Sequence, residues 1–233
     1  MKATRKILFA TAAVLILFVQ AFTIDYPHIP SSGPFSAFYP SDEKAITTDP
    51  DYSGSPQNTS FTENEAQKSI SISEFRKTVE TGNPGVVTGI FSEDRFALDV
   101  IQQPAGQPAY VSTISDVVTE FSMASDYGTL GLMAHNYLAG ENFFHLQPGD
   151  IIQIVYGDGD IQKYAIYDVQ RYQALQPNSP RSQFVDLDTN EQLTATQLFK
   201  RVYMGGHRLT IQTCIQEGSV DSWGRLFLLA EPI

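Results

Sequence analysis

Cysteine and basic residues are both scarce in this sequence. Cys214 is the one cysteine among 233 residues, so no disulfide can form within the chain. The 15 Lys and Arg residues are outnumbered by 26 Asp and Glu residues, for a formal net charge of −11. This charge argues against nucleic acid as a partner and against adhesion of the folded part to an anionic membrane surface. Apolar residues, by contrast, make up 42% of the chain, enough for the core of a globular domain.

Residues 1–24 have the features of an export signal. Lys2, Arg5 and Lys6 precede an uncharged, mostly apolar stretch, and both a cleaved signal peptide and a retained membrane anchor match this pattern. In either case the basic flank stays in the cytoplasm and the rest of the chain is delivered outside.

Residues 25–68 differ in composition from the rest of the chain. They are rich in Pro, Ser, Thr and Asp, with few aliphatic residues and no sustained period. Such a composition predicts an extended, solvated tether. We therefore expect one folded domain, which covers residues 69–233.

Strand-like periodicity dominates that domain. Apolar runs bounded by turn residues predict strands over residues 85–91, 95–101, 129–134, 151–156, 162–172, 208–213 and 226–230. Helices are expected over residues 114–124 and, with Thr194 as N-cap, over residues 194–203. Short strands with a turn about every ten residues favour a closed or nearly closed β-barrel over a βαβ sheet.

Cys214 is an unpaired thiol in an exported chain, although exported domains use cysteines in pairs. It is therefore either an inert buried side chain or a thiol kept for its chemistry. His135 ends one predicted strand and Arg225 opens another. An imidazole can take the proton of a thiol, and a guanidinium can stabilise an oxyanion. The three residues together supply what an acyl-transfer site needs.

Each of these residues also has a purely structural interpretation. Cysteine is among the most buried residue types, so Cys214 can be a core residue. His135 can be a turn residue, and Arg225 can be a surface residue beside Trp223. These interpretations stay open at the level of the sequence.

Other residues compete for functional roles but have weaker claims. His207 is separated from Cys214 by strand residues that span roughly 20 Å, and His145 lies in a turn-rich segment. Asp158 and Asp160 alternate with glycines as in a hairpin turn, which is a better interpretation than a cation site. We therefore expect neither a metal nor a cofactor.

The sequence motifs around these residues resemble those of the sortase family of bacterial cysteine transpeptidases. The family's nucleophile motif is usually written TLxTC, and residues 210–214 read TIQTC, with Ile211 in place of Leu. The family's His follows a small residue, as His135 follows Ala134, and its Arg starts the last strand, as Arg225 is expected to do. The resemblance covers roughly residues 85–232.

This resemblance implies a mostly β fold, a closed eight-stranded sortase-like β-barrel with one or two short helices. Cys214, His135 and Arg225 would meet at one end of the barrel as the catalytic residues. The activity implied is cleavage of a sorting-signal peptide through a Cys thioester and transfer of the acyl group to an amine. The implied partners are surface proteins that carry a sorting signal, an amine acceptor on the cell wall or on a pilin lysine, and the membrane, through residues 1–24.

Four alternatives differ in chain order or in chemistry. Papain-like peptidases place Cys before His, whereas here His135 comes first. The L,D-transpeptidases have the right order but carry an Arg two residues after Cys, where this chain has Gln216. An exported cysteine hydrolase and a non-catalytic exported β-barrel that binds a surface ligand also remain. A binding domain has no reason to keep a reactive thiol.

Overall fold

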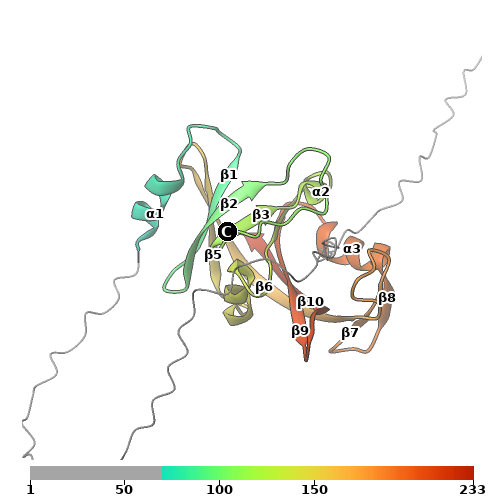
Figure 1. The fold of residues 1–233 in the computed structure, drawn as a ribbon. Coiled ribbons are helices and arrows are strands. Elements are labelled where there is room, and N and C mark those ends of the chain that lie inside the picture. Colours follow the sequence, from blue (N-terminus) through green and yellow to red (C-terminus); the bar gives the residue numbers. More distant parts are fainter. Residues whose placement is uncertain (1–69) are drawn as a thin grey trace, which may run out of the picture. The chain divides into compact units, whose positions relative to one another are not determined.

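The computed structural model describes residues 70–233, and their strands wrap into a barrel (Figure 1). The predicted export signal (residues 1–24) and tether (residues 25–68) lie outside the described residues. Over the range 70–233, none of the helices has the length and apolar character that a membrane crossing requires.

Eight strands close the barrel, in the order β10-β9-β4-β3-β2-β1-β5-β6, because β6 pairs back onto β10. Neighbouring strands are antiparallel except for two parallel pairs, β2–β3 and β4–β9. The eight strands are β1 (Val87–Ser92), β2 (Phe96–Gln102), β3 (Val117–Glu120), β4 (Thr129–Met133), β5 (Ile151–Tyr156), β6 (Ile161–Ala174), β9 (Arg208–Glu217) and β10 (Val220–Pro232). The prediction of a closed eight-stranded barrel is confirmed.

Two short strands and four short helices complete the described part of the chain. β7 (Gln183–Asp186) and β8 (Gln192–Thr194) extend the sheet beyond β6. The helices are α1 (Ile72–Val79), α2 (Ser122–Ser125), the 3-10 helix η1 (Ala139–His145) and α3 (Ala195–Tyr203). In Figure 1, α1 lies at the left of the barrel and α3 lies at the right, beside β8.

Alternation along the strands sends apolar side chains to two separate clusters. The lumen cluster fills the barrel and has members from all eight strands, including Val87, Leu98, Val118, Leu132, Ile152, Ile166, Ile211 and Leu228. The α3 cluster lies on the outer face of the sheet, under α3, and includes Met133, Tyr172, Phe184, Leu198, Phe199, Tyr203, Phe227 and Leu229. Neighbouring residues of one strand therefore point to opposite sides of the barrel wall.

The helix predicted over residues 114–124 is wrong. This segment forms strand β3 and then the four-residue helix α2. β3 pairs in parallel with β2 and antiparallel with β4, so sheet pairing of its β-branched residues overrides the helix-like spacing. The second predicted helix is found as α3, and Thr194 caps it in a capping box with Gln197.

Candidate active site

Cys214 on β9 lies directly opposite Arg225 on β10. Side chains alternate along β10, so the positions of Arg225's neighbours show which side of the barrel wall Arg225 faces. Leu226 and Leu228 belong to the lumen cluster, whereas Phe227 and Leu229 belong to the α3 cluster. Arg225 and Cys214 therefore lie on the outer face of the barrel wall.

His135 reaches the same place through the parallel pair β4–β9. The last residue pair of this ladder is Met133 with Gln212, and His135 and Cys214 each come two residues later. The backbone N–H of Ala134 donates to the carbonyl of Gln212 at 3.2 Å, which continues the register past the end of β4. The neighbouring strands β4, β9 and β10 thus bring the three predicted residues into one row.

The segment after His135 is fixed against β9. Thr213 Oγ1 donates to the carbonyl of Ala134 at 2.9 Å. Gly140, in η1, packs so closely that an added Cβ would clash with Thr213 Oγ1 and would lie 2.6 Å from the carbonyl oxygen of His135. Its backbone N–H also donates to that carbonyl, at 3.0 Å. Glycine is therefore required for η1 to lie against this end of the row.

Arg225 is buried, with 1% of its surface exposed, and lies in the interior of β10. The expectation that it starts the last strand is corrected, and so is its interpretation as a surface residue. Its Nη1 donates to the carbonyls of Ser222 and Gly224, both at 2.7 Å, which fixes the plane of the guanidinium. Burial lowers the pKa of Arg225, and the charge of Cys214 acts in the opposite direction.

His135 is half-buried, and this burial lowers the pKa of its imidazole below the usual value. A hydrogen bond with the backbone of Val111 acts in the opposite direction. The ring also stacks on Tyr137, with centroids 5.2 Å apart and an interplanar angle of 23°. The imidazole is therefore held in place from two sides and favours its neutral form, which is the form that can accept a proton.

Cys214 is a free cysteine and is 7% exposed. It lies on the face of the α3 cluster but belongs neither to it nor to the lumen cluster, nor to a third, smaller cluster that Phe75 and Val79 of α1 form with β1 and β5. Its interpretation as ordinary core is therefore weakened, because its immediate cross-strand neighbour is a buried guanidinium and not an apolar side chain.

The other two histidines among residues 70–233 lie elsewhere. His207 is exposed in a bend before β9, so the length of strand from Arg208 to Cys214 separates it from the thiol. His145 is exposed at the end of η1, and its carbonyl accepts a hydrogen bond from Arg95 Nη1. Neither is brought to the row.

Three groups lie next to the row although nothing in the sequence indicates that they belong to the site. Tyr172 on β6 is the cross-strand partner of Arg225 on its other side and is fully buried. The carbonyl of Pro177 lies 3.5 Å from Arg225 Nη2, and the backbone of Val111 contacts His135. Two of these groups are backbone atoms, which any residue could supply, and the third depends on the closure of the barrel.

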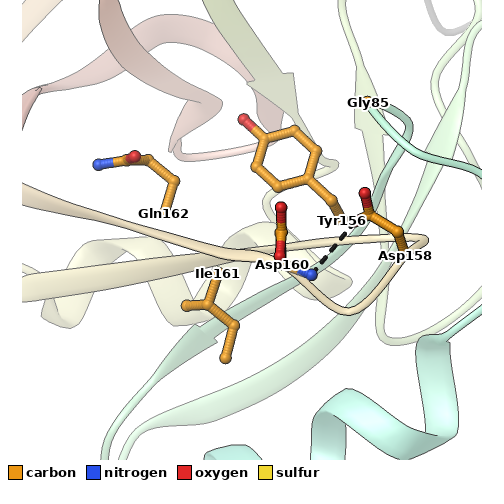
Figure 2. Close-up of a pocket in the computed structure, with 6 residues that line it drawn as sticks. All are labelled: Gly85, Tyr156, Asp158, Asp160, Ile161 and Gln162. Carbon is orange, nitrogen blue, oxygen red and sulfur yellow. Dashed lines mark hydrogen bonds between the residues drawn. The ribbon is translucent and has the colours of Figure 1, made fainter.

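Asp158 and Asp160 form the predicted hairpin turn between β5 and β6. The backbone N–H of Asp160 donates to Asp158 Oδ1 at 3.2 Å, as Figure 2 shows. Over the described range, no group of three or more His, Cys, Asp or Glu side chains is placed to hold a metal ion.

Comparison with known proteins gives structural matches only, since no protein-family model and no curated protein sequence matches this chain. Sortase A from Listeria monocytogenes is 13% identical, with a TM-score of 0.40 over 64% of this chain and 87% of that one. A sortase D5 transpeptidase from Clostridium perfringens is 19% identical, with a TM-score of 0.41 over 71% and 90%. A Clostridium perfringens sortase C, solved with the C-terminal cell wall sorting motif, is 13% identical, with a TM-score of 0.41 over 66% and 73%.

Proposed function

We propose that this chain is a sortase-like cysteine transpeptidase that works on the outer surface of a bacterial cell. The observation that carries the proposal is the common row of Cys214 on β9, Arg225 on β10 and His135, which lies two residues past the end of β4. The TIQTC motif at residues 210–214 supports the proposal independently. A thiol, a neutral imidazole and a fixed guanidinium on one face are suited to acyl transfer.

In the proposed reaction, neutral His135 takes the proton of the Cys214 thiol as the sulfur attacks a backbone carbonyl carbon of the substrate. The C–S bond forms, and the carbonyl electron pair moves to oxygen. The positive charge of Arg225, whose plane is fixed by the carbonyls of Ser222 and Gly224, stabilises this oxyanion.

Collapse of the tetrahedral intermediate breaks the C–N bond and leaves a thioester on Cys214. His135, now an imidazolium, gives its proton to the departing amine. A second amine then attacks the thioester carbon, with neutral His135 accepting its proton. The new C–N bond forms, the C–S bond breaks, and the imidazolium returns the proton to the departing sulfur, which restores the thiol. Attack by water in place of the amine would give hydrolysis.

The proposed setting follows from the parts of the sequence outside the described residues. Residues 1–24 would export or anchor the chain, residues 25–68 would hold the barrel away from the membrane, and the catalytic domain would begin near residue 69. The proposed partners are surface proteins that carry a sorting signal, as donors, and a cell-wall or pilin amine, as acceptor.

Product analysis separates the proposed transpeptidase from its alternatives. The full-length protein would be incubated with sorting-signal peptides, with and without an amine such as triglycine, and the products identified by mass spectrometry. A transpeptidase yields the joined acyl–amine product, whereas a hydrolase yields only the cleaved acid. A binding domain yields neither product, and its Cys214 would resist a peptide-sized alkylating agent.

A further inference from the structure

A cavity of about 240 Å³ opens at the other end of the barrel from His135, Cys214 and Arg225. Thr129 and Arg208, the first residues of β4 and β9, line it. His135 and Cys214 come six residues later along these two strands, roughly 20 Å away at the usual rise of a strand. This cavity is therefore separate from the row on β4, β9 and β10.

Glu120 is the acidic group of this cavity. Glu120 comes two residues after Val118 on β3, so its side chain lies on the same side of the strand as this member of the lumen cluster. It therefore faces the mouth of the barrel. Gln102 Nε2 donates to its Oε2 at 3.3 Å, and Ser125 supplies a second side-chain hydrogen bond. Among residues 70–233 no Lys, Arg or His forms an ion pair with Glu120. Burial raises its pKa, which reflects a carboxylate short of charge compensation.

Two tyrosines line the same cavity. Tyr164 belongs to the lumen cluster, and Tyr156 packs against it. Their side chains hydrogen-bond to each other, and the charge of Glu120 acts on Tyr156. A carboxylate and two electron-rich rings therefore border one opening, and this is the combination that attracts an organic cation.

The basic residues at the cavity do not neutralise Glu120. Arg208 Nη2 donates to the carbonyls of Arg201 and Met204, at 2.9 and 2.8 Å, so its guanidinium is held at the end of α3. His207 is exposed at the rim. The inner wall of the cavity therefore carries the Glu120 carboxylate, and no guanidinium or ammonium of residues 70–233 is paired with it.

We propose that this mouth of the barrel binds an organic ammonium group, with Glu120 as its counter-ion and Tyr156 and Tyr164 as its aromatic walls. A second cavity, which shares Gly85 and Tyr156 with the first, extends past Asp158 and Asp160 (Figure 2) and would take the rest of an amine-bearing chain. One carboxylate with two phenols is a poor ligand set for Ca²⁺, which takes six to eight oxygen ligands. The ligand class is therefore an alkylammonium and not a metal ion.

The probe for this site is n-butylammonium, with 1-butanol as its uncharged counterpart of similar size. Binding would be followed by amide chemical shifts of the full-length, ¹⁵N-labelled protein in a non-ionic detergent at neutral pH. The expected result is that n-butylammonium shifts Thr129, Leu130 and Gly85 in a saturable way, while 1-butanol does not. Glu120→Gln, which keeps the shape of the side chain, should weaken the binding about tenfold or more, because it removes a charged hydrogen-bond partner.

Two further variants separate this site from the proposed active site. Glu93→Gln, in the exposed β1–β2 turn at the other end of β1, should bind n-butylammonium as the wild type does. Cys214→Ala should also bind it unchanged, because the thiol belongs to the other end of the barrel. Equal binding of 1-butanol, no binding of the amine, or full affinity in Glu120→Gln would each overturn the proposal, whatever the activity of Cys214.

Discussion

Arg225 is the direct cross-strand partner of Cys214 in the β9–β10 ladder. The two residues are neighbours in space because their strands form a hairpin. The register of this hairpin places them opposite each other, although they are eleven residues apart in the sequence. The guanidinium is also fixed by two carbonyls of its own strand, those of Ser222 and Gly224. A planar, immobile donor beside the thiol is what the proposed oxyanion step requires.

Replacement of Arg225 should reduce acylation and stability together. Arg225→Lys should be almost as damaging as Arg225→Ala, with acylation lowered about 10²- to 10³-fold, because Lys offers a point charge in place of a planar fork. The carbonyls that accept hydrogen bonds from Arg225 would lose their donor, which should lower the free energy of unfolding by about 1–3 kcal/mol. Single-turnover acylation and urea unfolding measure the two effects.

Arg171 provides the matched control for this experiment. It lies on the neighbouring strand β6, next to Tyr172 in sequence, but is exposed. Arg171→Ala should leave acylation and unfolding near the wild-type values. Near-normal acylation in Arg225→Lys would show that only the positive charge matters, and near-normal acylation in Arg225→Ala would remove Arg225 from the site.

The histidines can be separated in the same assay. His135→Ala should lower acylation about 10²- to 10⁴-fold, the range attributed to positioned proton transfer. His207→Ala should change it little, because His207 lies before the start of β9. The reversed pattern would transfer the acid–base role to His207.

Burial of His135 predicts a loss of stability in acid. Its folded-state pKa is lowered below 6.5, the value expected for the unfolded chain, so the unfolded state binds more protons as the pH falls. The contribution of His135 is complete above about pH 6.5 and is lost as the pH falls toward the lowered pKa.

His135→Gln isolates this effect, because Glu120, whose pKa is raised, titrates in the opposite sense in both proteins. Urea unfolding of the wild type and of the variant would be compared at several pH values between neutrality and mild acid. We expect the wild type to lose stability relative to the variant on acidification. A constant difference would contradict the buried, neutral imidazole.

The variant Gly140→Ala tests whether η1 holds the His135 segment in position. A Cβ at this position would press on Thr213 Oγ1 and on the carbonyl of His135, so Gly140→Ala should displace the His135 segment and lower acylation. Overpacking of this kind destabilises by about 1–3 kcal/mol. Gly82→Ala is the control, since its Cβ would meet no atom and only its positive φ opposes the change. It should lower the unfolding temperature without a change in acylation, and equal acylation in both variants would exclude the supporting role.

Most strands were predictable from the sequence because they depend on local patterns, whereas the row of His135, Cys214 and Arg225 depends on the pairing of β4 with β9 and was expected only from the resemblance to sortases. The β5 strand was predicted with the bounds observed, and the cap of α3 at Thr194 follows from a Thr placed three residues before Gln197. β3 was not predicted, because its pairing with β2 and β4 is decided by residues distant in the sequence. The burial of Arg225 was missed for a similar reason, since Tyr172 and the carbonyl of Pro177 that enclose it come from β6 and the loop after it.

The central claim is that Cys214 is the nucleophile, and the most direct test is the mass of the intact protein after incubation with sorting-signal peptides. The full-length wild type should gain the mass of the acyl fragment, the adduct should map to Cys214, and hydroxylamine should release it as expected of a thioester. Cys214→Ala should fold with a wild-type unfolding profile and gain no mass. An adduct that persists in Cys214→Ala, or cleavage of the peptides by that variant at a comparable rate, would contradict the account.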